Sequence, residues 1–198
     1  MDLLIFLHAL TALFVIIDPI GTALIFNALT HGQNTRAKFT QALKASIISA
    51  VLLVLFGNYG ADLLSYLGIS INALKISGGV LLFYTAFQMI NSELNFRMED
   101  KVEDISVYPM SIPLLAGPGS LTVSILLFSS VTGSTDQLAI FMAVITICAL
   151  TFLFMSCSVY LKNIVGKTGD EILRRFLGVL LAALAIQFIL DGLSSILN

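Results

Sequence analysis

The sequence predicts an all-α membrane protein with six transmembrane helices, arranged as two inverted three-helix repeats whose first and fourth helices are broken by proline. Three observations support this prediction. Hydrophobic residues make up 58% of the 198 residues and charged residues only 11%, against about 25% in a typical soluble domain. Long stretches contain no Asp, Glu, Lys or Arg, and the two halves of the chain resemble each other at an offset of 99 positions.

The internal repeat is clearest near the end of each half. Residues 79–90, GVLLFYTAFQMI, and residues 178–189, GVLLAALAIQFI, share their first four residues, an alanine, a glutamine and a final isoleucine. An offset of half the chain length indicates one module written twice. We therefore expect one integral membrane domain in which residues 1–99 form the first three-helix repeat and residues 100–198 form the second.

Six apolar segments are long enough to cross a bilayer, because a hydrocarbon core of about 30 Å needs roughly 20 helical residues. The first has no basic residues before it, unlike a signal peptide, so we keep it as a span. The second and third are uncharged over 17 positions each, the fourth and fifth lie in longer uncharged runs, and the sixth is uncharged over 15 positions before Asp191. The predicted spans cover residues 3–30, 41–59, 72–91, 108–130, 137–161 and 175–196.

The basic residues predict the orientation. The loops after the first, third and fifth spans, together with the span ends next to them, collect nine of the ten Lys and Arg residues, and only Lys75 lies on the other side. The positive-inside rule places these loops in the cytoplasm and both termini outside. If the two proline-broken segments were re-entrant hairpins, the basic residues would divide five against five. Full crossings are therefore favoured, and three crossings per copy make the repeats inverted.

Each repeat opens with an apolar segment that proline interrupts, DPIG at residues 18–21 and GPGS at residues 117–120. Proline ends a preceding helix and suits the first position of a new one, and Asp18 is placed to cap the new half-helix. In an inverted pair the two half-helix N-termini meet at the membrane centre. We expect free amides there to favour an anionic group, and the carbonyls that end the first half-helices to favour an ammonium group or a cation. The amides are those of Gly21, Thr22, Ser120 and Leu121, and the carbonyls are those of Ile16, Ile17, Leu115 and Ala116.

The candidate substrate-binding residues are those at the two breaks and the two glutamines that the offset relates. They are Asp18, Pro19, Gly21, Thr22, Gly117, Pro118, Gly119, Ser120, Gln88 and Gln187. Each also has a structural interpretation: Asp18 as a helix cap, and the glutamines as hydrogen-bonding partners between helices. The roles of Asp191, near the outer end of the sixth span, and of His8, near the outer end of the first, stay open.

Three further segments stand out: IIDPIGTALIFNALT (16–30), YPMSIPLLAGPGSLT (108–122) and VGKTGDEILRRFLGVLLAALAIQFILDGL (165–193). Together they resemble the MarC family of integral membrane proteins, and the similarity covers essentially the whole chain. The resemblance implies a six-helix protein of the cell inner membrane and, for members of the SnatA type, transport of neutral amino acids such as glycine and alanine. Many members carry Asn at the position of Asp18 and others carry Asp, so coupling of transport to protons through this residue stays open.

The leading hypothesis is a secondary transporter of small neutral amino acids that works by alternating access around a midplane site at the two breaks. Its expected partners are a small neutral amino acid, the lipid bilayer and a coupling proton or sodium ion, with no nucleic acid, cofactor or resident metal. The alternative is an ion or metal transporter or channel that coordinates a cation at Asp18 and the broken-helix carbonyls. An enzyme is not expected, because the two histidines, His8 and His31, lie near opposite ends of the first span. Transport direction and oligomeric state stay open.

Overall fold

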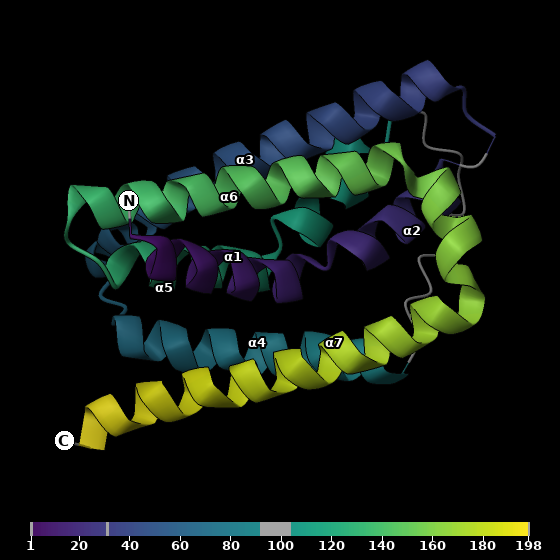
Figure 1. Cartoon of the computed structure of the whole chain (residues 1–198). Helices are drawn as coiled ribbons and strands as arrows, with labels where there is room; N and C mark the ends of the chain where they lie inside the picture. The colour runs from purple at the N-terminus through teal and green to yellow at the C-terminus, as the bar shows by residue number, and fades with distance from the viewer. Residues whose placement is uncertain (1, 31, 92–103, 198) are drawn as a thin grey trace.

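The computed structural model describes residues 2–30, 32–91 and 104–197, and every regular element within these ranges is a helix (Figure 1). The elements in order are α1 (Leu3–Ile17), α2 (Pro19–Leu29), α3 (Thr35–Tyr66), α4 (Ile71–Asn91), the irregular helix η1 (Ser106–Leu115), α5 (Pro118–Ser129), α6 (Ser134–Ser156) and α7 (Ser158–Leu197). Both chain ends lie at the left-hand end of the molecule in Figure 1. The prediction of an all-helical chain is confirmed for the described residues.

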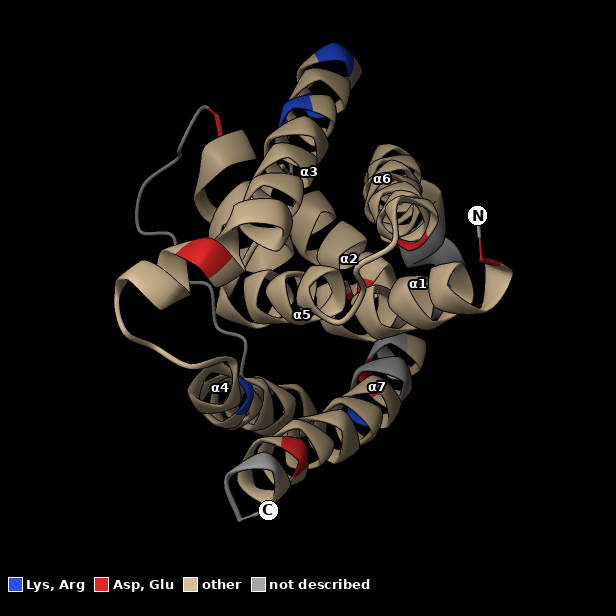
Figure 2. Cartoon of the chain, turned by 90° about the vertical axis from the view of Figure 1, so that its left-hand side faces the viewer, with Lys and Arg blue, Asp and Glu red and all other residues tan. Residues whose placement is uncertain are grey.

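Five helical stretches in this part of the chain are long and apolar enough to cross a membrane. A sixth crossing is available if η1 and α5, which bend by 56° at their junction, count as one span. The first stretch, Leu3–Leu29, joins α1 and α2. Figure 2 shows that the helix walls carry few charged residues, as a surface in contact with lipid requires.

Two helices extend beyond the predicted spans. α3 begins six residues before the predicted span 41–59 and ends seven residues after it, because the prediction followed the uncharged run and a helix continues through charged residues outside the bilayer. Asn34 caps its start, where Oδ1 accepts a hydrogen bond from the Ala37 amide at 2.7 Å. α7 includes the predicted cytoplasmic connection, and Gly166, with φ of 63°, interrupts its helical backbone.

α4 and α7 lie side by side and approach closely at glycines (Figure 1). A Cβ atom added to Gly79 would lie 2.7 Å from the carbonyl oxygen of Ala185, and one added to Gly178 would lie 3.2 Å from the carbonyl oxygen of Ala86. The side chains next to these glycines are Ile189 and Ile90, respectively. Small residues of this kind let helix backbones approach each other where lipid offers no hydrophobic drive for association.

The buried face of α3 supports η1 and α5. Small residues at helical spacing line this face, and Ala42, Ala45 and Ser49 are inaccessible to solvent. The Ser111 hydroxyl of η1 donates to the Ala45 carbonyl at 3.1 Å, and the Ser124 hydroxyl of α5 donates to the Leu53 carbonyl at 2.7 Å. These hydrogen bonds fix the bent pair η1 and α5 along α3.

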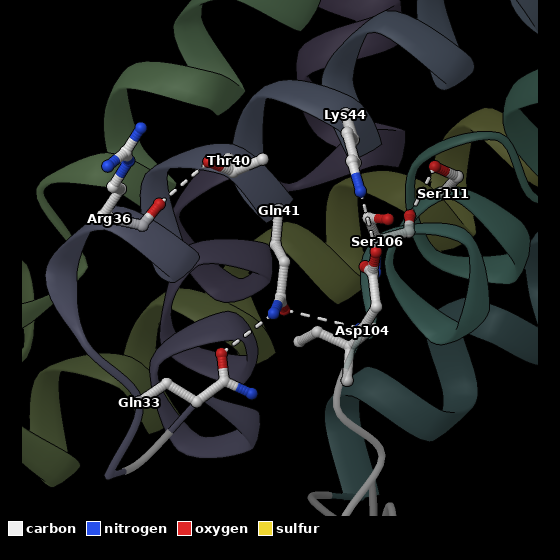
Figure 3. Close-up of polar contacts among 9 residues, drawn as sticks. Gln33, Arg36, Thr40, Gln41, Lys44, Asp104, Ser106 and Ser111 are labelled. Carbon is white, nitrogen blue, oxygen red and sulfur yellow. Dashed lines mark hydrogen bonds and ion pairs between the residues drawn. The ribbon is translucent and has the colours of Figure 1, made fainter.

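A polar cluster anchors the start of η1 to α3 (Figure 3). The Lys44 ammonium lies 3.0 Å from an Asp104 carboxylate oxygen, and the Ser106 amide donates to the other at 2.9 Å. Hydrogen bonds from Ser106, together with Lys44, lower the pKa of Asp104 to about 2. Buried Gln41 donates to Gln33 at 3.0 Å, which joins the segment before α3 to the same cluster.

Candidate functional site

The first helix break centres on Asp18, which ends α1 and begins α2. Its amide donates to the Phe14 carbonyl at 3.0 Å, and its Oδ1 accepts from the Gly21 amide at 3.0 Å. Asp18 has left-handed backbone angles, φ 45° and ψ 71°, which Asp and Asn tolerate better than other side chains do. Pro19 takes the first position of α2. The prediction that Asp18 caps a half-helix starting at Pro19 is confirmed.

The second break lies between η1 and α5 and is built differently. Gly117 precedes the first helical residue, Pro118, and α5 begins without a side-chain cap. η1 is not a regular half-helix, because Pro109 and Pro113 each remove a backbone donor and clash with the preceding turn. Both of these prolines follow cis peptide bonds. The expectation of two equivalent broken helices is therefore wrong for the first half of the second one.

Side-chain hydroxyl groups donate hydrogen bonds to backbone carbonyls that we expected to be unpaired at the breaks. The Thr22 hydroxyl donates to the Ile17 carbonyl at 2.8 Å, and the Ser120 hydroxyl donates to the Leu115 carbonyl at 2.7 Å. In each case a side chain five residues farther along the chain crosses the break. The prediction that these two carbonyls are unpaired is wrong.

Most of the amides expected to be free also have partners. The Gly21 amide donates to the Asp18 side chain, the Thr22 amide donates to the Asp18 carbonyl at 2.8 Å, and the Leu121 amide donates to the Gly117 carbonyl at 2.9 Å. α2 is therefore closed by its own cap. Because α5 starts with proline and has no side-chain cap, its first amide donors are those of Gly119 and Ser120.

A cavity of about 200 Å³ lies where the two breaks meet. Five of the predicted site residues line it: Asp18, Gly21, Thr22, Gln88 and Pro118. The remaining lining residues are mostly apolar and come from α1, α2, α4 and η1: Ile16, Ile17, Ile25, Thr85, Met89, Pro113 and Leu114. Asp18 is the one titratable side chain among these twelve. We call this space the break cavity.

The other predicted residues lie outside the break cavity. Pro19 is buried, and Gly117 packs against the Pro113 carbonyl so closely that a side chain there would collide with it. Gly119 faces Leu82, whose Cδ2 would lie 2.6 Å from an added Cβ, while Ser120 holds the Leu115 carbonyl. Gln187 lies elsewhere.

Gln187 lines a second cavity of about 530 Å³ with His8, Lys75, Ser130 and Asp191. Its Nε2 donates to Asp191 Oδ1 at 2.7 Å. The structure therefore separates the two glutamines that the repeat relates, and only Gln88 reaches the breaks.

Sequence reasoning missed Thr85, Ile25 and Leu114 as residues of the break cavity. Thr85 lies three residues before Gln88 on α4, and this spacing puts both side chains on one helix face. A polar residue at that spacing was a usable signal. Ile25 and Leu114 carry none, because apolar residues at helical spacing occur on every face of these spans.

Comparisons with known proteins place the chain in a family. The sequence profile described as MarC family integral membrane protein matches residues 3–197. UPF0056 membrane proteins of Archaeoglobus fulgidus and Bacillus subtilis (YvbG) are each 32% identical, over 96% and 94% of this chain and 92% of each relative. UPF0056 membrane protein MJ1677 of Methanocaldococcus jannaschii is 29% identical over 98% of both chains. No solved structure matches significantly. The chain therefore belongs to the MarC family and is a multi-pass integral membrane protein.

Proposed function

We propose that this protein is a secondary transporter of small neutral amino acids, such as glycine and alanine, which bind in the break cavity. The observation that carries the proposal is the meeting of both helix breaks at one small cavity with a single carboxylate, that of Asp18. Broken helices at corresponding positions of two repeats are where transporters of this architecture bind their substrates.

The size of the break cavity favours a small ligand. Its volume of about 200 Å³ is below the range of roughly 300–1,000 Å³ that is typical of sites for drug-sized molecules. Isoleucine, methionine and leucine side chains form much of its wall. A short apolar side chain fits such a wall, whereas a charged side chain finds no counter-charge there besides Asp18, which the substrate ammonium group needs.

The charges of the break cavity suit the two ends of a zwitterion. Asp18 attracts the substrate ammonium group. Pro118 brings the uncapped start of α5 to the cavity wall, and the positive end of this helix favours the substrate carboxylate there. This assignment replaces the symmetric pair of helix N-termini that the sequence suggested, because Asp18 already closes α2. It also explains why the cavity needs no lysine or arginine.

Two features support alternating access by inverted repeats. In Figure 1, α1–α2, α4 and α6 run away from the end that carries the termini, while α3, α7 and the η1–α5 pair run back toward it. The glycine contacts of α4 and α7 are reciprocal under the offset: Gly79 meets Ala185 and Ile189, and Gly178 meets Ala86 and Ile90. Such reciprocity is the signature of a two-fold axis between equivalent surfaces.

Uptake of labelled glycine into proteoliposomes tests the proposal. We expect alanine to compete, and glycinamide and acetate to compete poorly, because each lacks one end of the zwitterion. Asp18→Asn should raise the half-saturating glycine concentration, whereas Asp62→Asn, at an exposed position of α3 away from the cavity, should leave it unchanged. Competition by sodium, potassium or magnesium with amino acids inert would favour a cation transporter instead. Equal competition by glycine and glycinamide would refute the role of α5.

A further inference from the structure

The second cavity differs from the break cavity in charge and position. Its polar residues come from the ends of helices: His8 from the second turn of α1, Lys75 from the second turn of α4, Ser130 from the C-cap of α5, and Gln187 and Asp191 from the last turns of α7. The start of α1, the start of α4 and the end of α5 lie at the end of the molecule that carries both chain termini, as does the end of α7 (Figure 1). We call this second cavity the terminal cavity.

The terminal cavity is related to the break cavity by the internal repeat. Leu184, Gln187 and Phe188 line the terminal cavity, and 99 positions earlier Thr85, Gln88 and Met89 line the break cavity. In the terminal cavity, α7 is joined by α5 of the same repeat and by α1 and Lys75 of the first repeat. In the break cavity, α4 is joined by α1 and α2 of the same repeat and by η1 and Pro118 of the second repeat. A two-fold relation of inverted repeats therefore gives each side of the membrane its own cavity.

Residues of α1, α4 and α5 line both cavities. On α1, Ala12 lines the terminal cavity and Ile16, one turn later, lines the break cavity. Between them Leu82 of α4 is fully buried against Gly119. A Cβ added to Gly119 would lie 2.6 Å from Leu82 and 3.8 Å from Ile16. Leu82 thus lies on α4 between Lys75, which lines the terminal cavity, and Thr85, which lines the break cavity.

We propose that the terminal cavity is a second binding site for the same zwitterion. This inference rests on the proposed function. Lys75 binds the carboxylate group and Asp191 binds the ammonium group. Gln187 holds the Asp191 carboxylate by its 2.7 Å hydrogen bond, so the negative charge stays on the cavity wall. The break cavity has no lysine or arginine, so the terminal cavity recognises the carboxylate by a different chemistry, a mobile ammonium in place of helix amides.

Glycine protection of single cysteines tests the second site in right-side-out vesicles. The background carries Cys148→Ala and Cys157→Ser, and a membrane-impermeant thiol reagent is applied from outside. Ser130→Cys reports on the terminal cavity, and Thr85→Cys reports on the break cavity after treatment with a permeant reagent. Ser129→Cys is the matched control, because it is exposed on the same helix end and does not line the cavity.

We expect glycine to slow modification of Ser130→Cys and not of Ser129→Cys. Lys75→Gln should raise the half-protecting glycine concentration at Ser130→Cys by about tenfold, since a hydrogen bond to a charged group is lost. Protection of Thr85→Cys should persist in that variant, and Lys75→Arg should restore protection at Ser130→Cys.

The outcomes separate the two proposals. Protection of Thr85→Cys alone, or a Lys75→Gln variant with unchanged protection at Ser130→Cys, would overturn the second site and leave the proposed function standing. Protection of Ser130→Cys alone, lost in Lys75→Gln, would uphold the terminal site and overturn binding at the breaks. If glycine protects neither cysteine, both proposals fail.

Discussion

Substitution of Asp18 separates the two structural contributions of this residue. Its side chain caps α2, and its backbone adopts the left-handed conformation at φ of 45°. Loss of an N-cap costs about 0.5–2 kcal/mol of stability, and the left-handed conformation costs an ordinary residue about 1–2 kcal/mol. Asp18→Ala should therefore destabilise the protein by about 2–3 kcal/mol. Asp18→Asn keeps both features and should cost little, while Asp18→Gly loses only the cap.

Asp2→Ala is the matched control for this series. Asp2 caps α1 by accepting from the Leu4 amide at 2.8 Å, but its φ of −77° is ordinary. Its replacement should cost the cap alone, about 1 kcal/mol, so the excess loss in Asp18→Ala measures the left-handed contribution.

Equilibrium unfolding in mixed detergent micelles with increasing dodecyl sulfate measures these differences. Far-ultraviolet circular dichroism is the suitable signal, because the chain contains no tryptophan. The reasoning is refuted if Asp18→Ala costs no more than Asp2→Ala, or if Asp18→Asn is as damaging as Asp18→Ala.

Three further predictions follow from packing, charge and topology. Gly79→Ala should destabilise the protein by about 1–3 kcal/mol and Gly178→Ala by less, because an added Cβ at Gly79 lies closer to a backbone carbonyl. Equal losses of stability in thermal scans would contradict this. The pKa of Asp104 is lowered from 3.8 to about 2. The contribution of this carboxylate to folding stability is therefore fully present above the unfolded value near 3.8 and is lost as the pH falls through about 2. The stability advantage of wild type over Asp104→Asn should vanish across that range. In a cysteine-free background, Thr35→Cys should be labelled from the cytoplasm and Ser134→Cys from outside; the reverse pattern would refute the orientation.

The sequence located the breaks well because proline acts locally. Pro19 and Pro118 begin α2 and α5 as predicted, and Asp18 caps as its residue type suggests. The hydroxyl bonds of Thr22 and Ser120 were not predictable in the same way, since they depend on the angle at which the chain leaves each break.

The repeat pairs residues of the two halves, but it does not predict where in the structure each member of a pair lies. The offset pairs Gln88 with Gln187 and suggested one shared site, whereas the structure puts the two side chains in separate cavities. The span limits failed at α3 because its helix extends past the uncharged run that defined the prediction.

The hydroxyl bonds across the two breaks limit where this protein can bend. Each break has a threonine or serine whose hydroxyl group holds the end of the preceding segment, so we expect both breaks to be stiff. We expect a stiff break to transmit motion between its two segments and not to act as a hinge. If the proposed transporter opens one cavity while it closes the other, we expect the change to occur by movement between packed helices. The close contact of α4 and α7 at Gly79 and Gly178 is the surface along which we expect this movement.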